Sequence, residues 1–120
     1  MISRNKNESD KALRKCNYEC IVCGYNKIIK GHHLVVGAHV RAFESGNEFD
    51  VASNIIALCP NCHAEYDSYM FYIEPKTKHL IYLDESNPFH NKDVSNKIMY
   101  VDDKFLAYNT YLFKKNNGLL

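Results

Sequence analysis

Residues 38–67 read AHVRAFESGNEFDVASNIIALCPNCHAEYD, and this stretch decides the fold of the chain. It holds His39, Asn54 and His63 in that order, with Asn54 following His39 by 15 positions (54−39) and His63 following Asn54 by 9 (63−54). A CPNC turn, residues 59–62, stands directly before the second histidine. The combined string is far more specific than a lone histidine or a lone CxxC pair.

Four of the five cysteines form two CxxC pairs, each of which places two thiols on a tight turn. A tetrahedral zinc site takes its ligands at this spacing, so the pairs predict a structural zinc ion held by Cys20, Cys23, Cys59 and Cys62. Buried structural thiols are the alternative interpretation. Cys16 lies four residues before Cys20 and is either a rival ligand or, as we favour, a partly buried free thiol on a helix.

Length and composition limit the class of protein. A chain of 120 residues with 46% hydrophobic residues suits one compact domain. The formal net charge of +1 neither supports nor excludes a nucleic-acid partner. The sequence lacks an apolar run of membrane-spanning length, and its first residues lack the apolar core of a secretory signal. We therefore expect a cytoplasmic protein with reduced thiols and no membrane partner.

The string NIIALCPNCH, together with His39 and the first CxxC pair, resembles the HNH endonuclease family over Cys20–Asp67. The resemblance implies an α+β protein with a small zinc-stapled ββα-metal fold, in which the nuclease hairpin is inserted between the two cysteine turns. It also implies a metal-dependent endonuclease that hydrolyses the phosphodiester bonds of DNA, most simply double-stranded DNA. A restriction, phage or mobile-element role is compatible with this resemblance.

The sequence pattern predicts how the elements follow one another. A short helix is expected over 8–18, strands over 27–40 and 55–58, and a helix that begins at Pro60, because proline suits a first helical turn. A hairpin over 71–83 and a helix over 102–115 should complete the fold. Residues 1–120 would then be a single nuclease domain with its core at 16–70, a flexible tail at 1–7 and the hairpin and C-terminal helix within 71–120.

Phosphodiester hydrolysis needs a base, a cation and a stabilised leaving oxygen. His39 is predicted to be the general base, because imidazole can take a proton from water near neutral pH. His63 and Asp67 lie four apart on one helix face and are predicted to hold the catalytic divalent ion, with Mg²⁺ expected and Mn²⁺ or another ion possible. The amide of Asn54 would fix the hairpin that carries His39, the supporting role that the family assigns to its Asn.

Basic residues near these positions are candidate DNA contacts. Arg41 lies two positions beyond His39 and would share its strand face. Arg14 and Lys15 form a basic face on the predicted first helix. Each could bind a phosphate oxygen.

Two observations leave alternatives open. Many relatives carry Asp or His directly before the catalytic histidine, whereas this chain has Ala38, so an Ala38→Asp change is predicted to add a metal ligand. The pair His32–His33 offers another register for the first motif, but the spacing to Asn54 favours His39. The alternative function is a zinc-stabilised DNA- or RNA-binding module without catalysis.

Overall fold

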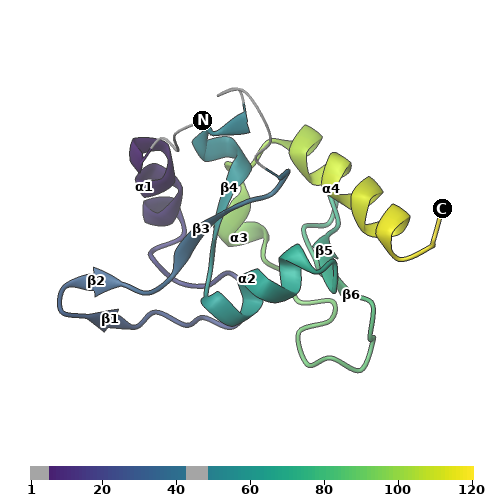
Figure 1. Ribbon diagram of the computed structural model, residues 1–120, viewed down its shortest axis with the longest axis horizontal. Coiled ribbons are helices and arrows are strands. Elements are labelled where there is room, and N and C mark those ends of the chain that lie inside the picture. Colours follow the sequence, from purple (N-terminus) through teal and green to yellow (C-terminus); the bar gives the residue numbers. More distant parts are fainter. Residues whose placement is uncertain (1–5, 43–48) are drawn as a thin grey trace.

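The computed structural model describes residues 6–42 and 49–120 and has the predicted mixture of helices and strands (Figure 1). The elements are α1 (Lys6–Lys15), β1 (Ile28–Ile29), β2 (His32–His33), β3 (Val36–His39), the 3₁₀ helix η2 (Ala52–Asn54), β4 (Ile55–Leu58), α2 (Pro60–Asp67), β5 (Phe71–Ile73), β6 (Leu80–Tyr82), α3 (Ser95–Ile98) and α4 (Asp103–Asn116). Lys6 and Asn7 belong to α1, whereas the sequence predicted a flexible tail over residues 1–7. Residues 45–48, a polar stretch between the strands predicted over 27–40 and 55–58, lie outside the described residues.

A ββα unit forms the centre of the fold. β3 pairs antiparallel with β4, and His39 lies opposite Ile55. All four residues of β4 are buried, which explains why this strand is continuously apolar rather than alternating. The chain then turns at Cys59, whose Sγ accepts a hydrogen bond from the backbone N–H of Cys62, and α2 begins at Pro60.

α1 packs closely against this hairpin. It contacts β3, η2 and β4. At Gly37 in β3, a Cβ atom would collide with the Ser9 side chain of α1 and would come within 3.0 Å of Cγ2 of Ile55. Glycine at position 37 therefore permits the close approach of helix and strand.

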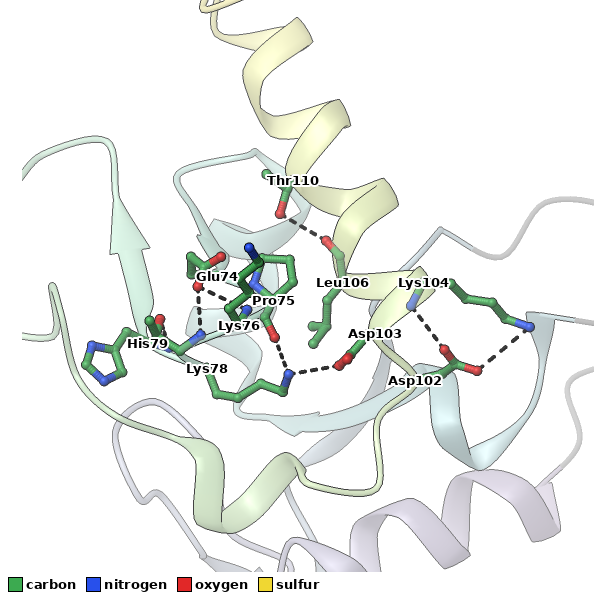
Figure 2. A network of polar contacts seen from close by, with 11 residues as sticks. Glu74, Pro75, Lys76, Lys78, His79, Asp102, Asp103, Lys104, Leu106 and Thr110 are labelled. Atoms are coloured by element: carbon green, nitrogen blue, oxygen red, sulfur yellow. Dashed lines mark hydrogen bonds and ion pairs between the residues drawn. The ribbon is translucent and has the colours of Figure 1, made fainter.

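The C-terminal half covers the other side of the ββα unit. β5 and β6 pair as the predicted hairpin, and α4 packs on β5. Lys78 of the hairpin turn forms an ion pair with Asp103 at the start of α4, with Nζ and Oδ1 2.8 Å apart (Figure 2). Asp102 caps α4 by accepting a hydrogen bond from Lys104 N. The short helix α3 was not predicted.

The hydrophobic core joins these layers. Its largest fully buried side chains come from the first CxxC segment, β4, β5, β6, α3 and α4, and they include Ile21, Ile56, Leu58, Phe71, Leu80, Ile98 and Leu106. The β1–β2 hairpin extends from this body and is exposed (Figure 1). Among the described residues, no helix has both the length and the apolar character that crossing a bilayer requires.

Candidate active site

The four paired cysteines come together in space as predicted. Their sulfur atoms all lie within 4.8 Å of one another, and the Sγ atoms of Cys23 and Cys59 are 3.8 Å apart. Four sulfurs at the corners of a tetrahedral zinc site with Zn–S bonds of roughly 2.3 Å would be about 3.8 Å apart. The cluster of Cys20, Cys23, Cys59 and Cys62, called the cysteine cluster below, therefore has a geometry that could hold a zinc ion.

A backbone contact brings the two turns together. Ile21 N donates a hydrogen bond to Ala57 O at 3.0 Å, so the first CxxC turn is attached to β4, which runs directly into the second turn. Gly24 closes the first turn at φ +79°, a conformation that suits glycine, and its N–H donates to Cys20 O. Local turn geometry and one strand contact thus assemble a site from residues far apart in the sequence.

The thiols of the cysteine cluster influence one another's ionisation. A hydrogen bond from Cys62 lowers the pKa of Cys20 to about 4. The same hydrogen bond, together with burial, raises the pKa of Cys62, and burial raises the pKa of Cys23. A bound cation would replace these shared protons, because metal ligation requires thiolates.

Cys16 lies outside the cysteine cluster. Its side chain is buried, and its Sγ lies 3.2 Å from the hydroxyl of Tyr100. That hydroxyl donates to Ile55 O at 2.6 Å. Cys16 is therefore a thiol outside the cluster, as the sequence favoured, but it lies directly after α1 and is buried more completely than expected.

A separate cavity of about 330 Å³ lies between the end of β3, α2 and α4. Three of the predicted site residues line it, namely His39, His63 and Asp67. The remaining lining residues are Val40, Ala42, Tyr66, Tyr69, Asn109 and Leu112. We call this space the α2–α4 cavity.

His39 has a carboxylate partner that sequence reasoning missed. Nε2 of His39 lies 2.9 Å from Oδ1 of Asp50, and the two side chains are 6% and 2% exposed. A carboxylate oxygen accepts hydrogen bonds, so this contact is typical of the tautomer in which Nε2 is the donor. Asp50 stands in a polar loop stretch, where an acidic residue is easily taken for a turn former.

Asn54 joins residues 41 and 49 through its side-chain amide. It is fully buried, and its Oδ1 accepts from Arg41 N at 2.8 Å. Its Nδ2 donates to Arg41 O at 3.0 Å and to Phe49 O at 2.7 Å. Three hydrogen bonds from one amide hold residues 41 and 49 together, beside the His39–Asp50 pair.

Tyr66 links the helix to the end of β3. Its hydroxyl donates to Val40 O at 2.8 Å. Burial raises the pKa of Tyr66 well above its ordinary value, so the hydroxyl remains a donor. Because Val40 follows His39 and Tyr66 precedes Asp67, this hydrogen bond sets the distance between strand end and helix.

His63 and Asp67 form an exposed pair across one turn of α2. Nε2 of His63 lies 3.2 Å from Oδ2 of Asp67, and the side chains are 29% and 66% exposed. Two ligands at right angles around an octahedral Mg²⁺ with bonds of roughly 2.1 Å would lie about 3 Å apart. The nitrogen and oxygen donors therefore fit one divalent cation.

The structure corrects the expectation for Ala38. Its side chain is 1% exposed, belongs to the hydrophobic core and is not among the residues that line the α2–α4 cavity. Successive residues of a strand point to opposite faces, so Ala38 and His39 diverge. An aspartate at position 38 would enter apolar surroundings. We therefore expect Ala38→Asp to destabilise the fold rather than to add a metal ligand.

The predicted DNA contacts lie in different places. The guanidinium of Arg41 is held between two rings, with Cζ 4.2 Å from the centroid of Phe49 and 3.9 Å from that of Tyr108. Its Nε is buried and has no hydrogen-bond partner among the described residues. Arg14 and Lys15 are exposed at the end of α1 and do not line the cavity. His33 stacks on Tyr18 on the exposed β2 and is likewise outside the cavity.

Comparison with known proteins shows what the chain is similar to. A family model described as HNH endonuclease matches residues 20–74, so this segment is similar to HNH endonuclease domains. The chain is 35% identical over 51 residues to Anaredoxin of Nostoc sp. (strain PCC 7120 / SAG 25.82 / UTEX 2576). The matched region covers 42% of this chain and 58% of that protein.

A solved structure extends the likeness beyond this segment. The Modification dependent TagI restriction endonuclease matches with a TM-score of 0.72 and 22% identity, over 91% of this chain and 38% of that protein. At this identity the match concerns the fold. The chain thus spans little more than half of one relative and well under half of the other.

Proposed function

We propose that this protein is a metal-dependent DNA endonuclease whose α2–α4 cavity contains the reaction centre. The observation that carries the proposal is that a carboxylate-bound histidine, His39, lines the same cavity as the His63–Asp67 pair. The HNH endonuclease match over residues 20–74 supports a nuclease in general. Double-stranded DNA as the substrate, and cytoplasmic work in restriction or in a mobile element, are part of the proposal.

In this mechanism His39 is the general base. Asp50 holds the proton of Nε2, so Nδ1 can take a proton from the attacking water. Asn54 keeps residues 41 and 49 close together, and the hydrogen bond from Tyr66 to Val40 keeps the end of β3 close to α2. These residues keep the base in a fixed geometry relative to the helix.

We assign His63 and Asp67 to the catalytic divalent ion, with Mg²⁺ as the expected metal. When bound, such an ion acts as a Lewis acid on the phosphate and stabilises the departing 3′ oxygen. The two side chains are the protein's contribution, and phosphate oxygens and water would complete the coordination. Cleavage should leave 5′-phosphate and 3′-hydroxyl ends.

The cysteine cluster has a structural role in this proposal, with zinc as its metal. Soft thiolates at tetrahedral spacing suit zinc, and four protein ligands leave no open position for substrate. Binding would fix the turn from which α2 begins, since Cys59 caps that helix. The zinc site thus supports the position of His63 and Asp67 without taking part in the chemistry.

Nicking of a supercoiled plasmid tests the proposal. Purified protein should convert the plasmid to open-circular and linear forms when Mg²⁺ or Mn²⁺ is added. A second candidate is a nucleic-acid-binding module without catalysis, which is favoured by the burial of the His39 imidazole, 6% exposed. DNA binding without nicking under any divalent ion would select the second candidate.

A further inference from the structure

α4 carries a polar residue in the middle of its apolar face. Phe105 and Phe113 are both 3% exposed, and they share one helix face because they are two turns apart. Asn109 lies midway between them and is 5% exposed. At a position with this spacing, an apolar residue is the ordinary choice.

The side chain of Asn109 makes no hydrogen bond with the described part of the protein, whereas other asparagines do. Asn54 is equally buried and makes three side-chain hydrogen bonds. Asn116 and Asn117 donate to carbonyls of their own helix. The polar atoms of Asn109 are not among the fully buried, unpartnered side-chain atoms of the described residues, so solvent in the cavity reaches the amide and a ligand could do the same.

The surroundings of Asn109 indicate a role in the reaction centre. It lines the α2–α4 cavity together with His39, His63 and Asp67. It belongs to α4, outside the segment 20–74 that matches the HNH endonuclease family. Sequence reasoning based on the family motif therefore had no position for it.

The helix that carries Asn109 is held firmly. The ion pair between Lys78 and Asp103 fixes its first turn to the β5–β6 turn, and Thr110 donates to Leu106 O within the helix at 3.0 Å (Figure 2). The neighbouring Tyr108 stacks on the guanidinium of Arg41, which follows His39 by two positions. α4 is thus attached both to the β5–β6 hairpin and to Arg41, close to His39 in the sequence.

We propose that Asn109 is a substrate-binding residue whose Nδ2 donates a hydrogen bond to a non-bridging oxygen of the scissile phosphate. This inference rests on the proposed function. A phosphate in the cavity needs N–H or O–H donors, yet none of the described lining residues is Lys or Arg, and the hydroxyl of Tyr66 already donates to Val40 O. The hydroxyl of the half-buried Tyr69 and the amide of Asn109 are then the uncharged donors that remain beside the two imidazoles. The amide of Asn109 offers two donors at the cavity wall.

The test compares Asn109→Ala, Asn109→Asp and Asn109→Leu in the full chain, with Asn116→Ala as the matched control on an exposed turn of the same helix. Affinity for a labelled short duplex is measured without added divalent ion. No chelator is used, because one would also remove metal from the cysteine cluster. Calorimetry gives Mg²⁺ affinity without DNA, and single-turnover cleavage and thermal melting complete the set.

We expect Asn109→Ala to weaken duplex binding about tenfold, and Asn109→Asp to weaken it further, because a carboxylate repels phosphate. Mg²⁺ affinity of Asn109→Ala should match that of the wild type. Asn109→Leu should cleave poorly but melt close to the wild-type temperature, since no hydrogen bond within the described protein is lost. Asn116→Ala should behave as wild type in binding and cleavage.

Three outcomes would overturn the inference. Binding and cleavage by Asn109→Ala equal to the wild type would remove Asn109 from the site while leaving the nuclease proposal intact. Weaker Mg²⁺ binding by Asn109→Ala with tighter binding by Asn109→Asp would make Asn109 a metal ligand instead. A wild type that neither binds nor cuts DNA would overturn both proposals.

Discussion

The cysteine cluster and the α2–α4 cavity share the short helix α2 but differ in the number and the exposure of the side chains that could bind a metal. Cys59 caps α2 and Cys62 lies in its first turn, both nearly buried. His63 and Asp67 lie on the same helix, with side chains that are 29% and 66% exposed. The first site offers four ligands from the protein, and the second offers two.

This difference separates stability from chemistry. A metal site with all four ligands supplied by the protein contributes to folding, because the unfolded chain cannot assemble it. A site with two exposed ligands leaves coordination positions for water and phosphate, as a reaction requires. The neighbouring residues Cys62 and His63 therefore belong to different sites, Cys62 to the structural metal site and His63 to the proposed reaction site.

Loss of a cluster ligand should have the largest effect. Cys20→Ser or Cys59→Ser should unfold the domain or lower its melting temperature by well over 10 °C, because structural zinc sites contribute roughly 10 kcal/mol or more of binding free energy to folding. Elemental analysis and thermal melting measure the result. Cys16→Ser is the control, since that buried thiol lies outside the cluster, and it should cost only about 1 kcal/mol. Purified protein without zinc, or unchanged melting of Cys20→Ser, would remove the structural site.

Changes in the α2–α4 cavity should affect chemistry with little effect on folding. His39→Ala should reduce cleavage about 10²- to 10⁴-fold, as expected for loss of a general base, with melting and DNA binding close to wild type. His63→Ala should reduce cleavage and also weaken Mg²⁺ binding, because His63 is assigned as a ligand. His33→Ala on exposed β2 is the control and should cut normally. If His33→Ala were inactive and His39→Ala active, the register of the first motif would be wrong.

Ala38→Asp distinguishes a core position from a ligand position. Because Ala38 is 1% exposed in the core, a carboxylate there should destabilise the fold by about 3 kcal/mol. Mg²⁺ affinity without DNA should not rise. Ala38→Ser is a smaller polar control. Tighter metal binding with unchanged melting would mean that position 38 reaches the cavity and that our correction is mistaken.

The parts of the molecule with local sequence signals were predicted well. Ile55–Leu58 forms the expected strand and Pro60 begins the expected helix, because each depends on neighbours in the sequence. The two CxxC pairs are distant in the sequence, and they come together as expected because each pair has the spacing of zinc ligands. The HNH resemblance, confirmed by the family match, supplied the arrangement between them.

The residues missed by the sequence depend on distant contacts. Asp50 pairs with His39 across a loop, and Asn109 reaches the cavity from a helix whose own sequence carries no nuclease motif. A polar residue within the Phe105–Phe113 stripe was the available signal for Asn109. Ala38 shows the reverse, since the family resemblance suggested a ligand position whereas strand alternation and burial assign it to the core.

The smallest effects are expected at the end of α1. Arg14 and Lys15 are exposed and away from the cavity, so Arg14→Ala and Lys15→Ala should leave single-turnover cleavage at saturating DNA unchanged. Each should weaken duplex affinity about twofold to fivefold and reduce the salt dependence of binding by roughly one counterion. Lys114→Ala, on an exposed turn of α4, serves as a charge-matched comparison. Unchanged affinity and salt dependence would exclude α1 from the DNA-binding surface.

The central claim is that the α2–α4 cavity cuts DNA with His39 as base and a metal at His63 and Asp67. Its most direct test is single-turnover cleavage of an end-labelled duplex across a Mg²⁺ titration, for wild type and His39→Ala in parallel, with the product ends identified. We predict no cleavage by zinc-loaded wild type without added Mg²⁺, saturable cleavage to 5′-phosphate and 3′-hydroxyl ends with it, and at least about 10²-fold slower cleavage by folded His39→Ala at every concentration. Equal rates for the two proteins, or wild-type cleavage that does not depend on a divalent ion, would contradict the account.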